Sequence, residues 1–137
     1  MKITASIQNS LGQHHVTLTT NDEPHSVTIP PKPSGLGSSV NGGELLFLAL
    51  ATCYCNDLYR EAAKRNIQVE KVEVEVSGDF GAEGEPAKNV TYSAKVHAKG
   101  TEEEIRALIQ HTDTVTEIQN TLRMGVDVKL SKIIIST

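Results

Sequence analysis

The sequence predicts an α+β fold with mostly antiparallel sheet, in one domain over residues 1–137. Short stretches of alternating apolar and polar residues open the chain, and a long proline-free stretch with helix-forming residues follows at 44–65. A valine-rich hairpin, two more helical stretches and a last strand complete the predicted order β-β-β-α-β-β-α-α-β. This length is sufficient to bury a hydrophobic core without disulfides.

The N-terminal stretches are predicted strands. Apolar residues alternate with polar ones at 3–7, 16–18 and 27–29, and the turn sequences "NSLGQ" and "TNDEP" separate the three runs. Few of these residues are large and apolar. We therefore expect the meander to pack against another surface, such as one on a second chain.

The middle of the chain predicts a loop and then a helix. "PPKPSGLGSSVNGG" at 30–43 is rich in Pro, Gly and Ser, and it matches no phosphate-binding pattern. The helix at 44–65 is expected to end at Asn66 in a left-handed conformation. Beyond it, Val69 to Val76 predict a strand, and "VTYSAKVHA" predicts its hairpin partner across a glycine-rich turn.

The C-terminal third predicts two helices and a strand. Thr101 is expected to cap a helix that runs to about residue 110, with acidic residues 102–104 in its first turn. A shorter helix is expected at 114–123, ending at Gly125. "VDVKLSKIII" then predicts the last strand.

Composition excludes several classes of function. The formal charge is -4 and no Lys/Arg run occurs, which argues against nucleic-acid binding. The longest apolar stretch, at 45–51, is too short to span a membrane, and no signal peptide is recognisable. Two closely spaced cysteines do not make a secreted disulfide framework. We therefore expect a cytoplasmic protein. The five histidines show no metal-binding spacing, so neither a metal nor another cofactor is expected.

The two cysteines lie close together in "ATCYCNDLY", within the predicted long helix. Residues two apart on a helix point about 200° apart, so Cys53 and Cys55 cannot form a disulfide with each other or chelate one metal. Cys55 shares its face with Leu48, Ala51, Leu58, Tyr59 and Ala62, and is expected in the core. Cys53 lies where the apolar face gives way to Asp57, Arg60 and Lys64.

That position makes Cys53 the candidate reactive thiol. Arg60 would favour its thiolate, whereas Asp57 would oppose it unless Arg60 pairs with Asp57. His111 lies shortly before Thr116 and would be a candidate base, or a solvated residue in a helix-terminal turn. The alternative for Cys53 is a purely structural role, which is common for helix cysteines.

Two stretches resemble the OsmC/organic hydroperoxide resistance family, of which the chain looks like a divergent member. "PSGLGSSVNGGELLFLALATC" resembles the family segment in which a Gly-rich loop leads into a central helix with "LLLAALAAC". "VTEIQNTLRMGVDVKL" resembles the second signature, Cys-Pro-x-x-x-Thr-Leu-x-x-Gly-Val-x-Val. The order of elements is also similar, over essentially the whole chain.

The resemblance implies an intertwined homodimer with thiol sites at the subunit interface. In the peroxidase branch, one cysteine attacks an organic hydroperoxide and becomes a sulfenic acid. A second cysteine resolves it to a disulfide, and a dithiol reductant restores the enzyme. Cys53 matches the attacking cysteine, and Cys55 has no counterpart.

Three positions depart from the family pattern. In the family, an arginine from the N-terminal sheet and a glutamate at the start of the helix hold the attacking thiol as thiolate. Here Thr116 stands in place of the resolving cysteine, and Gly43 stands in place of that glutamate, with Glu44 one residue late. No arginine precedes Arg60, so the N-terminal sheet cannot supply the activating guanidinium of the family.

Two hypotheses follow. The first is a one-cysteine hydroperoxide reductase that uses Cys53 and an external dithiol, with Arg60 or Arg123 replacing the missing arginine. The second is a non-catalytic homodimer that binds a small apolar ligand at its interface, with Cys53 lining the pocket.

Overall fold

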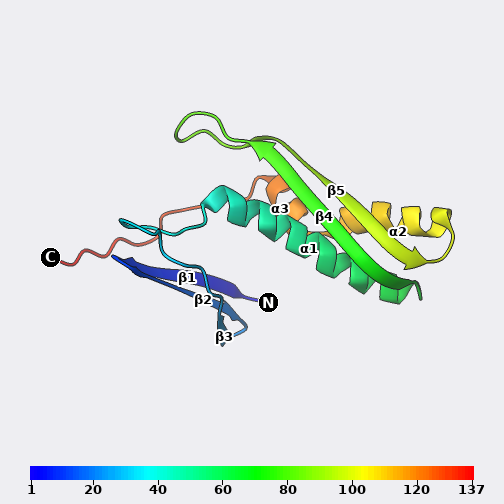
Figure 1. The fold of residues 1–137 in the computed structure, drawn as a ribbon, viewed down its shortest axis with the longest axis horizontal. Coiled ribbons are helices and arrows are strands. Elements are labelled where there is room, and N and C mark those ends of the chain that lie inside the picture. Colours follow the sequence, from blue (N-terminus) through cyan, green and yellow to red (C-terminus); the bar gives the residue numbers. More distant parts are fainter. The chain divides into compact units, whose positions relative to one another are not determined.

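The computed structural model describes all 137 residues and divides into two compact units, Met1–Leu46 and Phe47–Thr137. Figure 1 labels the helices and strands along the chain. The prediction of one domain over the whole chain stays a prediction.

The first unit is a three-stranded antiparallel sheet in the order β1-β2-β3, with β1 at Ile3–Ser10, β2 at Gln13–Thr20 and β3 at Glu23–Ser26. Asn21 and Asp22 both have positive φ, of 48° and 67°, between the paired residues Thr20 and Glu23. This is the backbone that a two-residue hairpin favours, and Asn and Asp tolerate it. The third strand therefore lies at residues 23–26, immediately ahead of the predicted run at 27–29 in the sequence, and that run is not part of any strand.

No residue of this sheet is buried, and all five buried apolar residues of the chain belong to the second unit. The loop after β3 closes on itself, because the backbone N–H of Ser39 donates to the carbonyl of Pro30 at 3.0 Å. Helix α1, Gly42–Lys64, begins with a reciprocal cap between Asn41 and Glu44.

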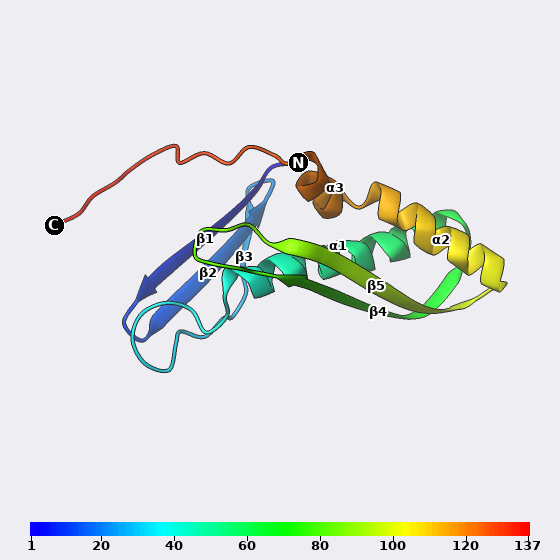
Figure 2. The same cartoon turned by 90° about the horizontal axis from the view of Figure 1, so that it is seen from above.

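The second unit packs helices against one hairpin. Strands β4, Gln68–Asp79, and β5, Lys88–Lys99, are antiparallel, and along most of β4 every second residue is half-buried. Asn66 has φ of 55°, which confirms the left-handed end predicted for α1. Figures 1 and 2 show the hairpin running along α1, and Figure 2 shows α2, Glu102–Val115, beside α1.

The buried apolar cluster joins α1 and α2. Tyr54, Leu58 and Ala62 from α1 meet Leu108 from α2, and half-buried side chains of β4 and β5 cover them. The Tyr54 hydroxyl donates to the carbonyl of Ile109 at 3.0 Å, which ties the two helices together. These contacts fix the face of α1 that points inward.

That face differs from the predicted one. Leu48 and Tyr59 were expected in the core but are 59% and 44% exposed, and Cys55 is only half-buried. Leu58 and Ala62 are buried as predicted, and the buried face continues through Leu50 and Tyr54, which the predicted face did not include. Tyr54 displaces the expected stripe, because the large ring packs against Tyr92 of β5 with centroids 5.1 Å apart. The prediction that Cys55 lies in the core is wrong.

The C-terminal third confirms both helices but not the last strand. Thr101 and Glu104 form a capping box on α2, and α3, Glu117–Met124, ends at Gly125 with φ of 63°. Residues 126–137 form no strand, because no other strand pairs with them, and their apolar side chains are exposed. The helices of the chain include none with the length and apolar character that a membrane crossing requires.

The buried cluster predicts the effect of truncating Leu58, which is fully buried. We expect Leu58→Ala to lower the free energy of unfolding by about 2–5 kcal/mol, because lost apolar burial and a residual cavity add together. Urea unfolding followed by circular dichroism would measure it. The matched control is Leu11→Ala, at a side chain that is 74% exposed, and equal effects of the two changes would contradict this core.

Candidate functional site

The Cys53 thiol lies between α1 and the start of α3. Its Sγ atom donates to Oδ2 of Asp57, one helical turn later, at 3.3 Å. It also lies 3.8 Å from Oε2 of Glu117, the first residue of α3. Thr116 has an extended backbone between α2 and α3, which turns the chain so that α3 begins beside α1.

Arg60 closes these contacts into a ring. Its Nη1 atom donates to Oδ1 of Asp57 at 3.0 Å and to Oε1 of Glu117 at 3.1 Å. Each carboxylate therefore turns one oxygen towards the guanidinium and the other towards the sulfur. We call the four side chains Cys53, Asp57, Arg60 and Glu117 the Cys53 ring.

Glu61 holds Arg60 from the other side. Its carboxylate accepts from Nε of Arg60 at 2.8 Å, from Nζ of Lys64 at 2.9 Å and from Nε2 of His111 at 3.0 Å. The hydrogen bond from Arg60, followed by that from Lys64, lowers the pKa of Glu61 to about 2. With Nε fixed in this way, the guanidinium directs Nη1 towards the Cys53 ring.

The pKa of the Cys53 thiol is raised above its ordinary value. Burial is the largest cause, and the hydrogen bond and charge of Asp57 and the charge of Glu117 add to it, while a backbone N–H of Ile118 acts against them. Burial, followed by the contact with Glu117, also raises the pKa of Asp57, whereas the pKa of Glu117 is lowered. The ring thus favours a protonated thiol beside a carboxylate that can accept its proton.

Cys55 lies on the opposite flank of the buried face. It lines an open hollow of about 280 Å³ with Ala51, Thr52, Asn56, Val72 and Val74. Successive helix residues are about 100° apart, so Cys53 and Cys55 flank Tyr54 on either side. One thiol faces α3 and the other faces β4.

The remaining predicted site residues have hydrogen-bond partners or positions of their own. His111 binds Glu61, and Arg123 pairs with Asp113 at 2.7 Å, next to a short hydrogen bond from Tyr92 to Asp113. Thr116 is fully buried and donates to the carbonyl of Asp113 at 3.2 Å. Glu44 caps α1, and Gly43 is the second residue of that helix.

Sequence reasoning missed Glu117 and Glu61. Glu117 stands at the first position of α3, where an acidic residue is explained by the helix dipole alone. Glu61 lies among charged residues and gives no sign of being buried, although its side chain is only 5% exposed. A contact between residues 53 and 117 depends on how α3 meets α1, which no local pattern encodes.

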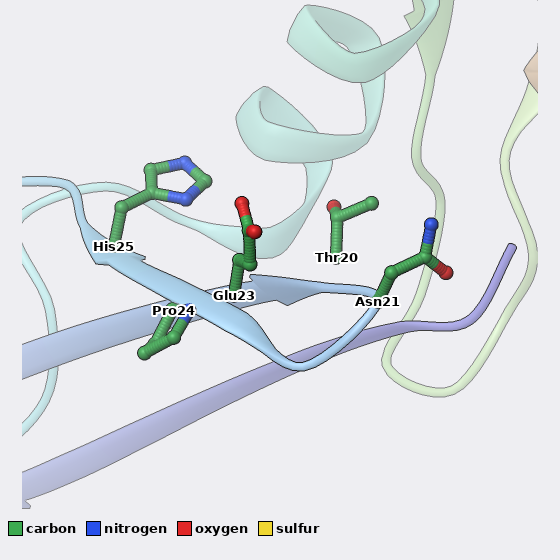
Figure 3. A pocket seen from close by; sticks show the side chains of 5 residues that line it. All are labelled: Thr20, Asn21, Glu23, Pro24 and His25. Atoms are coloured by element: carbon green, nitrogen blue, oxygen red, sulfur yellow. The ribbon is translucent and has the colours of Figure 1, made fainter.

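A possible metal-ligand cluster and a hollow in the first unit are two further places where polar side chains gather. Cys53, Asp57 and Glu117 each bring a possible metal-ligand atom within 4.8 Å of the others, but both carboxylates already pair with Arg60. In the first unit, a hollow of about 460 Å³ is lined by Thr20, Asn21, Glu23, Pro24 and His25. Figure 3 shows Glu23 and His25 on one side of the strand and Pro24 on the other, and none of the five lining residues is a cysteine.

Comparisons with known proteins agree on one family. The family model described as OsmC-like protein matches residues 35–131. An OsmC-like protein from Mycoplasma pneumoniae has a similar structure, with a TM-score of 0.61, 20% identity, and coverage of 90% of this chain and 89% of that chain. No curated protein sequence matches the chain.

Two further solved structures have names that refer to hydroperoxides. The organic hydroperoxide resistance protein OsmC from Legionella pneumophila has a TM-score of 0.52 and 24% identity, with 94% of each chain covered. The organic hydroperoxide resistance protein OhrB of Bacillus subtilis has a TM-score of 0.52 and 20% identity, with 92% of this chain and 95% of that chain covered. At sequence identities of 20–24%, these similarities in structure show a common fold and nothing more.

The ion pairs of Glu61 predict a pH-dependent stability. Because the folded state lowers the pKa of Glu61 from 4.5 to about 2, its contribution is complete above pH 4.5 and is lost as the pH falls towards 2. Glu61→Gln should therefore lower the free energy of unfolding at pH 7, and its difference from the unmodified protein should shrink between pH 4.5 and 2. Urea unfolding at a series of pH values would measure this.

The control for this prediction is Glu75→Gln, at an exposed position of β4. It should change the free energy of unfolding little, because the side chain is exposed. If Glu61→Gln gave the same loss at pH 7 and at pH 2, the depressed pKa of Glu61 would be refuted.

Proposed function

Since the chain belongs to the OsmC-like protein family, we propose that it reduces organic hydroperoxides through the thiol of Cys53. Two structural relatives are named as organic hydroperoxide resistance proteins. The cytoplasm is the proposed compartment, because both thiols are free. The observation that carries the proposal is the Cys53 ring, which surrounds a half-buried thiol with two carboxylates and a guanidinium.

The reaction needs one cysteine and an external thiol. The Cys53 sulfur attacks one oxygen of the hydroperoxide, the O–O bond breaks, and the products are a sulfenic acid and an alcohol. Sulfur is oxidised by two electrons and the peroxide is reduced. Cys55 lies on the other flank of α1 and Thr116 offers no sulfur, so an external dithiol would reduce the sulfenic acid, releasing water and restoring Cys53.

The raised pKa of Cys53 favours a second candidate function. A thiol that stays protonated reacts slowly, which suits a non-catalytic protein that binds a small apolar ligand at a dimer interface. In that case Cys53 would only line the pocket.

Either function is proposed for a homodimer. The sheet of the first unit leaves Ile3 and Ile7 more than half exposed, and the tail after α3 exposes Ile133, Ile134 and Ile135. A small sheet needs an apolar face packed against another surface to be stable in water. A second copy of the chain would supply the missing cover.

The hydroperoxide prediction uses both cysteines as each other's control. With cumene hydroperoxide and dithiothreitol, Cys53→Ser should abolish peroxide consumption, whereas Cys55→Ser should retain it. Peptide mass spectrometry should find Cys53 oxidised before Cys55. Peroxide loss that is negligible, with slow and equal alkylation of both thiols, would reject the reductase in favour of the binding function.

The dimer prediction is tested by light scattering after gel filtration. The protein should elute with the mass of two chains, and Ile3→Lys with Ile7→Lys should shift the mass towards that of one chain, because two charges then replace exposed apolar contacts. A control change at an exposed polar residue of the same strand, Gln8→Lys, should leave the mass unchanged. A single-chain mass for the unmodified protein at all concentrations would exclude the homodimer.

A further inference from the structure

The proposed reaction requires two proton transfers, one from the Cys53 thiol and one to the leaving oxygen of the hydroperoxide. The ring holds Cys53 as a thiol, whereas the thiolate is the form that attacks a peroxide. The alkoxide released when the O–O bond breaks is also a strong base and needs a proton. A group beside the sulfur that accepts the first proton and returns it to the alkoxide would answer both needs.

We propose that Asp57 is a catalytic residue of this site and carries the thiol proton of Cys53 to the leaving oxygen of the hydroperoxide. This inference rests on the proposed function. It differs from activation by an arginine placed against the sulfur, because the only guanidinium in the ring donates to the carboxylates.

The geometry favours Asp57 as the proton carrier. Its Oδ2 atom is the acceptor of the Cys53 thiol at 3.3 Å, and Arg60 holds the other oxygen at 3.0 Å, so the carboxylate is fixed towards the sulfur. Asp57 is 7% exposed, and burial shields the exchanged proton from water.

Glu117 is the weaker candidate. Its nearer oxygen is 3.8 Å from the sulfur and its side chain is 65% exposed, so water competes for any proton it would take. Its pKa is lowered, while that of Asp57 is raised towards the working pH by burial. A carboxyl group with a raised pKa holds a transferred proton longer, as a proton carrier must.

The Cys53 S–H bond breaks and its proton goes to Oδ2 of Asp57, and the sulfur attacks the terminal oxygen of the hydroperoxide. The S–O bond forms with the O–H of that oxygen retained, the O–O bond breaks, and the alkoxide takes the proton from Asp57. One thiol and one hydroperoxide give one sulfenic acid and one alcohol, and Asp57 ends as it began.

The test compares two reagents that both react with the Cys53 thiolate but release different leaving groups. Iodoacetamide releases iodide, which needs no proton, whereas cumene hydroperoxide releases an alkoxide. Asp57→Asn removes a negative charge beside Cys53, so alkylation of Cys53 should rise up to about tenfold as the thiol pKa falls. Oxidation of Cys53 by cumene hydroperoxide should instead fall at least about tenfold.

Glu117→Gln is the matched control, because it removes a neighbouring charge from the same ring. Alkylation and oxidation should both rise or both stay constant in this variant. If Asp57→Asn also raised the two rates together, Asp57 would act only through its charge, and the inference would fail while the proposed function stood. If Cys53 of the unmodified protein were oxidised no faster than Cys55, the proposed function itself would fail.

A measurement on the unmodified protein covers the case in which Asp57→Asn does not fold. The groups facing Asp57 are Cys53 and Arg60 from α1 and Glu117 from α3. The reactive form under this proposal has the thiol protonated and Asp57 ionised. Its population stays constant between the pKa of Asp57 and the pKa of Cys53. Oxidation should therefore reach a plateau at a pH where alkylation still rises. Parallel pH profiles would overturn the inference.

Discussion

The site depends on the ion pairs of Arg60. Asp57, Glu61 and Glu117 bring three carboxylates around this one guanidinium, and they come from two helices that are not neighbours in sequence. Without a cation these charges would repel one another and would be expensive to bury. The planar guanidinium has enough N–H donors to bind all three carboxylates. A lysine ammonium lacks this fixed arrangement of donors and would not orient the carboxylates in the same way. The start of α3 can therefore lie against α1.

The same pairing determines what the sulfur can do. A guanidinium directed at the thiol would stabilise a thiolate, but Arg60 donates to oxygen at every hydrogen bond it makes. The charge that acts on Cys53 is thus carboxylate charge, which a backbone N–H of Ile118 opposes. These contacts therefore favour the protonated form of the Cys53 thiol over its thiolate.

The sequence predicted the elements better than their contacts. Caps and turns are local, so Thr101, Asn66 and Gly125 marked helix ends correctly. The last strand was wrong because alternation at 126–135 specifies a strand only where a partner strand exists. For the site, the place of Cys53 near Asp57 and Arg60 followed from helix spacing. Glu117 could not be found, because its role arises from packing between helices.

Packing of α3 is the remaining condition for the site. This helix is eight residues long and is anchored by Gln119, whose Nε2 donates to the carbonyl of Leu50 at 3.0 Å. Gln119 is buried, yet its Oε1 atom has no partner. An unsatisfied buried acceptor costs about 1–3 kcal/mol, so the apolar contacts and the Arg60–Glu117 pair must offset it. Leu50 lies one turn before Cys53, and this anchor therefore sets where Glu117 and Ile118 meet the sulfur.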